Sequence, residues 1–372
     1  MATIRLIADD LTGALDAAVQ FTGAVPGFPV LLDHDVHRVL PEATTSAAIS
    51  TSSRDLDAAS AAARIAAAAP FVEGADIAFL KIDSLLRGHW PADLAALLAA
   101  YPGHVCGFAP AFPAQRRIMR NGRQYAPGPD GIMTALDPVP AAALAAAGCR
   151  TRSVPADRRA IDPLAAEPGT VFICDATDQD DLDRLATAAR KIDAPILWCG
   201  SAGLARALAA GGPRCVRPAP ARPLVIAGSA HPVTLAQIAA VPPAAARRVT
   251  LGADSTRAAA RITHDLAAMA CLVTVDVPPG TPNARAARVI AARLGATLPQ
   301  LAPPRSLVVI GGETLAAVCH AVGADALQLD GEYAPGVPCS RLGGGIWDGV
   351  PLLSRSGAFG GAEFLANLLA AG

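Results

Sequence analysis

Residues 3–20 read TIRLIADDLTGALDAAVQ. The first six are mostly apolar or branched, as in a buried strand, and Asp9 and Asp10 end that strand. Apolar side chains recur on one face of the next segment, which predicts a helix there. The hydroxyl of Thr12 can cap the start of that helix. The stretch therefore predicts a strand–turn–helix unit whose turn carries two adjacent acids.

This turn is a candidate ligand site. In open parallel α/β sheets, ligands bind beyond the carboxyl ends of the strands, and Gly13 lets a substrate approach the free N–H groups of the first helical turn. Asp9 and Asp10 can accept hydroxyl protons there or hold a metal. The alternative is that the two acids only cap the helix.

Length and composition bound the rest. A chain of 372 residues predicts two domains, and a net charge of −1 with 17% charged residues disfavours nucleic acid or an acidic membrane as a partner and favours small ligands. Eight cysteines without a CxxC pair argue against a zinc site or disulfide framework. No secretion signal or bilayer-spanning run is evident, so we expect a cytoplasmic protein. The sequence does not identify metal ligands, and it leaves open whether the protein forms a homo-oligomer.

Strand-like runs alternate with helix-compatible segments along the first half of the chain, which predicts a parallel α/β sheet. Polar residues collect where these runs end, as at 51–54 and 81–88. The runs are Pro29–Leu32, Ala47–Ser50, Ile77–Ile82, Val105–Phe108, Val171–Cys174 and Pro195–Cys199.

The segment KIDSLLRG, residues 81–88, suits a small polyhydroxylated acid. Arg87 can grip a carboxylate with its two-pronged guanidinium, and Asp83 and Ser84 can read hydroxyls. Lys81, one of only two lysines, supplies a point charge. The alternative is that Asp83 and Arg87 form an ordinary ion pair that steadies the loop.

The region from Pro110 to Pro140 shows no clear periodicity and predicts a long loop that is functional or mobile. Arg116, Arg117 and the Asn121-Gly122 pair within it can complete an anionic pocket, or can belong to a solvated basic loop.

A linker rich in Gly and Pro spans 211–223, and a second α/β domain begins with the expected strand Leu224–Ala227. Glycine-rich turns at 228–231, 311–314 and 354–360 can cradle a nucleotide phosphate with backbone N–H groups. Taken singly, each can equally be a tight helix entry. A Walker A loop and a well-placed GxGxxG are both missing.

Nine motifs stand in the order found in the four-carbon acid sugar kinase family, which the chain resembles over nearly its whole length. They include IADDLTGALD, SSRDLD, KIDSLLRG, AGSAHPVTLAQI, GGETLAAV and SRSGAFG. Members phosphorylate threonate, erythronate or 3-oxo-tetronate with ATP. The resemblance implies an N-terminal parallel-sheet, Rossmann-like sugar-acid domain at 1–212 and a C-terminal α/β ATP-binding domain at 222–372.

The resemblance also implies roles for individual residues. The family usually has Thr where Leu85 stands and Lys where Arg355 stands, and often Ser at His231. The implied sugar-acid contacts are Asp9, Asp10, Arg54, Lys81, Asp83, Ser84 and Arg87. The implied ATP contacts are Ser229, His231, Thr234, Gly311, Gly312, Glu313, Thr314 and Gly357.

Our hypothesis is in-line transfer of the ATP γ-phosphoryl group, with Mg²⁺, to the terminal hydroxyl of the acid. Asp10 or Asp83 orients or deprotonates that hydroxyl, Lys81 and Arg87 neutralise charge, and closure about the linker excludes water. One alternative is a non-catalytic cytoplasmic sensor of sugar acid and nucleotide. Another is a phosphatase of a related phosphorylated acid, which the lack of DxD spacing at Asp9 weakens.

Overall fold

The computed structural model describes residues 2–32, 45–128, 130–156, 167–192, 194–209, 211–217, 221–228, 231–278, 280–357 and 359–370. The chain divides after Pro213 into two compact units, unit 1 (Met1–Pro213) and unit 2 (Arg214–Gly372). No helix within the described ranges combines the length and the hydropathy that crossing a bilayer requires.

Unit 1 is built on a parallel sheet with the strand order β2-β3-β1-β4-β11-β5-β10-β9. All residues of β1, β3, β5 and β10 are buried, as expected for parallel strands covered on both faces. The strands are β1 (Ile4–Ala8), β2 (Phe28–Leu31), β3 (Ala47–Ser50), β4 (Ile77–Lys81), β5 (Val105–Ala109), β9 (Arg150–Val154), β10 (Thr170–Cys174) and β11 (Ile196–Gly200).

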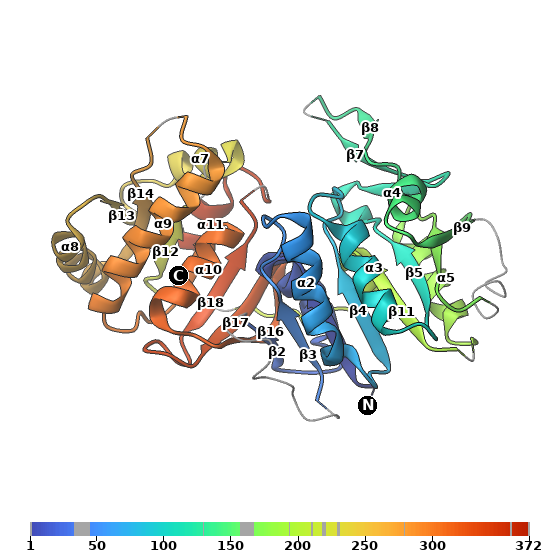
Figure 1. The fold of residues 1–372 in the computed structure, drawn as a ribbon. Helices are drawn as coiled ribbons and strands as arrows, with labels where there is room; N and C mark the ends of the chain where they lie inside the picture. The colour runs from blue at the N-terminus through green and yellow to red at the C-terminus, as the bar shows by residue number, and fades with distance from the viewer. Residues whose placement is uncertain are drawn as a thin grey trace. The chain divides into compact units, whose positions relative to one another are not determined.

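Helices follow most of these strands and pack in two groups. Helix α2 contacts α3, and α3 contacts α4, whereas α1 contacts α6, and α6 contacts α5. Figure 1 shows α2 and α3 side by side over the sheet. The helices are α1 (Leu11–Ala18), α2 (Ala58–Ala68), α3 (Trp90–Ala100), α4 (Pro140–Ala146), α5 (Gln179–Ala189) and α6 (Ala202–Leu208).

Helix α1 is capped by Asp10, not by Thr12 as the sequence predicted. Asp10 Oδ1 accepts a hydrogen bond from Gly13 N at 2.9 Å, and Thr12 Oγ1 donates to Asp10 Oδ2 at 2.7 Å. The Thr12 prediction was wrong because Asp10 has the extended backbone of a cap, whereas Thr12 already lies in the first turn.

The region from Pro110 to Pro140 contains a three-stranded antiparallel sheet, so the prediction of a long loop was wrong. Its strands are β6 (Ile118–Arg120), β7 (Arg123–Pro127) and β8 (Met133–Ala135). Asn121 and Gly122 turn the chain between β6 and β7 with φ values of 51° and 72°, as in a type I′ hairpin. Strands this short contain too few alternations to show a period, but the Asn-Gly pair was a usable signal.

Unit 2 has a second sheet with the order β13-β14-β12-β15-β18-β17-β16, in which β17 is antiparallel to both neighbours and the other pairs are parallel. The strands are β12 (Leu224–Ala227), β13 (Ala246–Leu251), β14 (Ala270–Val275), β15 (Leu307–Ile310), β16 (Ala326–Ala334), β17 (Val337–Gly343) and β18 (Pro351–Arg355). The helices are α7 (Pro232–Ala240), α8 (Ser255–Ala268), α9 (Asn283–Thr297), α10 (Gly312–Val322) and α11 (Phe364–Ala370).

The core of unit 2 joins its sheet to its last helix. Leu272, Ile310 and Leu353 of the central strands are buried in one cluster with Leu365 and Leu368 of α11. Helix α11 also packs on α7, and α9 packs on both α8 and α10.

The sequence located two strands to the residue, namely β3 and β12. It did not predict β9, β13 or the hairpin strands β16 to β18. Strands β9 and β13 each contain two arginines, which obscure the apolar signal on which the prediction relied.

Candidate active site

The predicted sugar-acid residues of unit 1 lie at one edge of its sheet. Strands β3, β1 and β4 are adjacent and parallel, so their carboxyl ends point the same way. Backbone N–H groups of the segment after β3 bind the end of β1, since Ser53 N and Arg54 N both donate to Asp9 O. We call the seven side chains gathered here the edge cluster: Asp9, Asp10, Arg54, Lys81, Asp83, Ser84 and Arg87.

Arg54 binds both acids that follow β1. Its Nε and Nη2 donate to the two carboxylate oxygens of Asp9 at 2.8 and 2.7 Å, and Nη2 also donates to Asp10 Oδ1 at 2.7 Å. Burial by itself lowers the pKa of Arg54, but the charges of Asp10 and Asp9 outweigh it and raise that pKa. Asp9 therefore anchors Arg54, while Asp10 both caps α1 and contacts the guanidinium.

The segment after β4 adds an ion pair between a buried acid, Asp83, and an exposed arginine, Arg87. Arg87 Nε donates to Asp83 Oδ2, which is the ion pair that the sequence offered as an alternative. Burial raises the pKa of Asp83, but the hydrogen bond and charge of Arg87 outweigh it and lower the pKa to about 2. Asp83 is thus an ionised acceptor at neutral pH, and Arg87 remains 63% exposed.

Lys81 lies beneath this edge and is only 6% exposed. Its Nζ donates to Ile82 O at 3.0 Å. A Cβ on Gly13 would overlap Asp10 Oδ1 and stand 2.9 Å from Lys81 Nζ, so only glycine leaves room for these two groups at the start of α1.

Arg117 and Gln124 reach the same edge from the small antiparallel sheet. Arg117 Nη1 donates to Ser84 Oγ at 2.6 Å, and Gln124 Nε2 donates to Ser84 O at 2.9 Å. Arg116 is exposed and donates to Gly131 O instead. No sequence pattern pointed to Gln124, because a buried glutamine in a short strand carries no signal of which residues it contacts.

In unit 2, the second and third predicted turns, at 311–314 and 354–360, lie at the ends of the adjacent parallel strands β15 and β18, whereas the first, after β12, falls partly outside the described residues. The second and third turns touch, because Gly311 N donates to Arg355 O at 2.9 Å. Gly311 has a φ of 105°, which only glycine adopts readily, and α10 begins directly after it. In the first turn of α10, Glu313 is exposed, Gly312 is partly buried and Thr314 is buried.

Helix α7 holds the third turn. Thr234 Oγ1 donates to Gly357 O at 2.8 Å, and Gln237 Nε2 donates to Phe359 O and Gly361 O at 3.2 and 2.7 Å. Thr234 and Gln237 are fully buried. The exposed His231 is the N-cap of α7, and Ser229 lies outside the described residues.

Arg355 is buried beside this turn without a carboxylate. Its Nη2 donates to Gln237 Oε1, its guanidinium lies 5.0 Å from the centre of the Phe364 ring, and Nε and Nη1 find no acceptor among the described residues. Burial lowers the pKa of Arg355 to about 10. The unpaired donors lie near Gly360 of the third turn, and buried donors without acceptors fit an anionic ligand.

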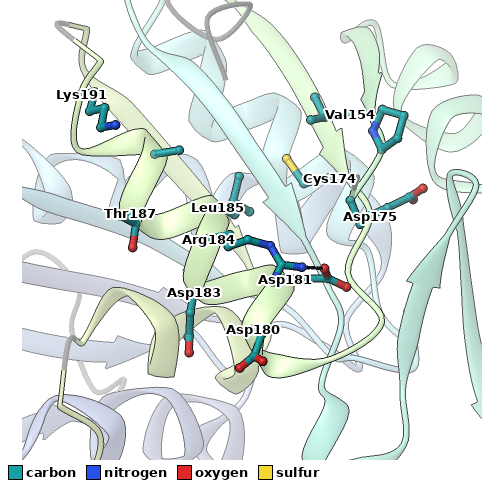
Figure 2. Close-up of a pocket in the computed structure, with 13 residues that line it drawn as sticks. Val154, Cys174, Asp175, Asp180, Asp181, Asp183, Arg184, Leu185, Thr187 and Lys191 are labelled. Carbon is teal, nitrogen blue, oxygen red and sulfur yellow. Dashed lines mark hydrogen bonds and ion pairs between the residues drawn. The ribbon is translucent and has the colours of Figure 1, made fainter. Parts of the chain in front are cut away.

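A pocket of about 770 Å³ lies elsewhere in unit 1, against α5 and the ends of β9 and β10 (Figure 2). Acidic side chains dominate its charged lining, with Asp175, Asp180, Asp181 and Asp183 against Arg184 and Lys191. Figure 2 shows Arg184 turned onto Asp181. No residue of the edge cluster lines this pocket, and its excess of carboxylates disfavours an acid substrate.

Known families match both halves of the chain. Residues 4–144 and 139–208 match a family described as a sugar-binding N-terminal domain, and residues 224–365 match one described as a nucleotide-binding C-terminal domain. A D-threonate kinase of Cupriavidus necator is 34% identical, with 95% of this chain and 94% of that protein aligned. The chain belongs to the four-carbon acid sugar kinase family.

A second curated relative and a solved structure are similar to this chain over the same span. A 3-oxo-tetronate kinase of Methylobacterium radiotolerans is 30% identical, covering 98% of this chain and 97% of its own length. A solved structure from Salmonella typhimurium LT2 shares the fold with a TM-score of 0.76 at 22% identity, covering 100% of this chain and 98% of its own. These findings confirm the family resemblance and the two-domain α/β architecture predicted from the motifs.

Proposed function

We propose that this protein is an ATP-dependent kinase that phosphorylates the terminal hydroxyl of a four-carbon sugar acid: threonate, erythronate or 3-oxo-tetronate. The carrying observation is the edge cluster, which sets cations and hydroxyl-binding acids at the carboxyl ends of β1, β3 and β4. Relatives named as D-threonate and 3-oxo-tetronate kinases support this substrate class.

We assign the sugar acid to residues 1–212 and ATP to residues 222–372. The first assignment treats the sheet of unit 1 as Rossmann-like, with its ligand at the carboxyl edge. The second rests on the Gly311–Thr314 turn and on the third turn at Gly357. The eight cysteines are all free, which suits the reducing cytoplasm as the compartment.

Each member of the edge cluster has a proposed task. Asp10 or Asp83 orients the reacting hydroxyl and accepts its proton. Ser84 forms a hydrogen bond with a second hydroxyl or with the carboxylate of the sugar acid. Lys81 and Arg87 neutralise the oxygens of the transferring group, and Asp9 keeps Arg54 in place. A pKa of about 2 makes Asp83 a weak base but a strong acceptor, so it suits orientation better than proton removal.

ATP and Mg²⁺ fit the donors that are present. When bound, Mg²⁺ would supply positive charge that offsets the negative charge of the phosphates. Within the described ranges no group of three or more His, Cys, Asp or Glu side chains is placed to hold a metal. This agrees with the usual magnesium site of kinases, in which one or two carboxylates act with the phosphates themselves.

The test is release of ADP with ATP and Mg²⁺ against D- and L-threonate, D- and L-erythronate and their 3-oxo forms. We expect turnover that depends on one of these acids and falls roughly 10²–10⁴-fold in Asp10→Asn, the range for a lost acid–base group. Asp57→Asn is the matched control, since Asp57 caps α2 as Asp10 caps α1 but lies outside the cluster. Acid binding without ADP release would favour the sensor, and hydrolysis of a phosphorylated tetronate would favour the phosphatase.

A further inference from the structure

Four cationic side chains meet at the edge of unit 1, and three of them already have a defined task. Arg54 binds Asp9 and Asp10, and Arg87 binds Asp83. Lys81 is buried against the start of α1 and donates to a backbone carbonyl. Arg117 is the fourth, and among the described residues its side chain forms no ion pair and only one hydrogen bond, to Ser84 Oγ.

The backbone fixes Arg117 in this position. Phe112 and Arg117 exchange two hydrogen bonds, Phe112 N to Arg117 O at 2.8 Å and Arg117 N to Phe112 O at 3.1 Å. Strand β6 starts at the next residue, and β7 is tied to the same edge by Gln124 Nε2, which donates to Ser84 O and Pro110 O. The guanidinium is therefore presented by a braced structure, which limits the entropy lost on binding.

The contact between Arg117 and Ser84 leaves hydrogen-bond donors on both side chains that can bind the same ligand group. Ser84 Oγ uses a lone pair to accept from Arg117 Nη1, so its own proton is free to be donated. Arg117 keeps further N–H groups, and its side chain is only partly buried. A guanidinium and a hydroxyl side by side match the two oxygens of a carboxylate.

We propose that Arg117, together with Ser84, binds the carboxylate of the sugar acid and makes the site select acids over neutral sugars. This inference rests on the proposed function of the same edge and refines it, because it assigns the carboxylate to Arg117 and leaves Arg87 with Asp83 and the reacting end. Burial lowers the pKa of Arg117, although the nearby charges of Asp83 and Asp16 oppose that shift.

The experiment measures binding by calorimetry without ATP, using the full chain. The probes are D-threonate and D-threonamide, its neutral amide, which has the same hydroxyls. The variants are Arg117→Gln, Arg117→Lys and Arg116→Gln, the last being an adjacent exposed arginine as the matched control. Thermal unfolding checks that each variant is folded.

We expect Arg117→Gln to weaken D-threonate binding by roughly 10- to 100-fold, the range for a lost charge-assisted hydrogen bond, and to leave D-threonamide binding within about twofold. Arg117→Lys recovers part of the loss, because it restores the charge but not the fork. Arg116→Gln changes neither probe. In the ADP assay, the KM for the acid rises while kcat is nearly kept, as for a contact made equally in the ground and transition states.

Equal weakening of both probes in Arg117→Gln, or no weakening of either, would overturn the proposal. A wild-type protein that binds D-threonate but releases no ADP contradicts the kinase alone, and Arg117 is then judged by the two probes. A wild-type protein that turns over the acid, with the same KM in Arg117→Gln, contradicts only the role of Arg117.

Discussion

Two arginines, one in each unit, have opposite surroundings: the side chain of Arg54 is 15% exposed, and Arg355 is 2% exposed. Arg54 of unit 1 meets two carboxylates, whose charges raise its pKa against the effect of burial. Arg355 of unit 2 meets the amide oxygen of Gln237 and the ring of Phe364, and burial lowers its pKa to about 10. One charge is neutralised within the fold, and the other is not.

The difference indicates which kind of ligand suits each unit. Where protein carboxylates already neutralise the cations, as around Arg54, the site can orient hydroxyl groups without an excess of charge. Arg355 remains protonated at neutral pH because its pKa stays near 10, so its charge acts through a poorly screening interior on anything near the third turn. A buried cation that meets no carboxylate among the described residues favours an anionic ligand such as phosphate.

The largest test of this comparison is Arg54→Met. The change leaves Asp9 and Asp10 facing each other without their counter-ion, so we expect a loss of about 3–5 kcal/mol in the free energy of unfolding. Urea denaturation measures it. Arg123→Met is the matched control, because the Arg123–Asp137 pair is exposed and is worth less than about 1 kcal/mol. Equal losses in the two variants would mean that Arg54 is no more than a surface ion pair.

A second test uses an unpaired acid of unit 1. Asp93, in the first turn of α3, is 2% exposed, and its Oδ1 has no hydrogen-bond partner in the described part of the chain. Burial, and secondarily the charge of Asp9, raise the pKa of Asp93 to about 7, although His89 opposes the shift. Burial thus moves Asp93 and Arg355 toward neutrality alike, but only Asp93 reaches the working range of pH.

The sign follows from linkage. A carboxyl whose pKa is higher in the folded state binds its proton more tightly there. The free energy of unfolding of the wild type therefore falls as the pH rises from about 4 to about 7. We expect Asp93→Asn to remove about 2–4 kcal/mol of that fall, measured by urea denaturation at about pH 4.5 and pH 8. Asp181→Asn is the control of opposite sign, since bonds from Thr177 outweigh burial and lower the pKa of Asp181. A parallel pH profile in Asp93→Asn and wild type would contradict the assignment.

The edge cluster could be read from the sequence, because the carboxyl ends of adjacent parallel strands share an edge wherever the strands are found. Asp9, Asp10 and Asp83 each follow a clear apolar run, so their proximity followed from local pattern. The partners Gln124 and Gln237 did not, because their contacts join residues 40 and more than 100 positions apart. That Arg355 lacks a carboxylate is likewise a property of packing, which no local pattern records.

The smallest expected effect on stability, and the sharpest test of the comparison, is Arg355→Met. Loss of the bond to Gln237 is offset by ending the burial of two unpaired N–H groups, so the free energy of unfolding should change by less than about 2 kcal/mol. Calorimetry should nevertheless show ATP binding about tenfold weaker, while Arg355→Lys keeps the charge and most of the affinity. Thr234→Val separates charge from position, because it removes only the hydrogen bond to Gly357 O. If Thr234→Val weakens ATP binding as much as Arg355→Met does, the geometry of the turn, and not the charge of Arg355, binds the nucleotide.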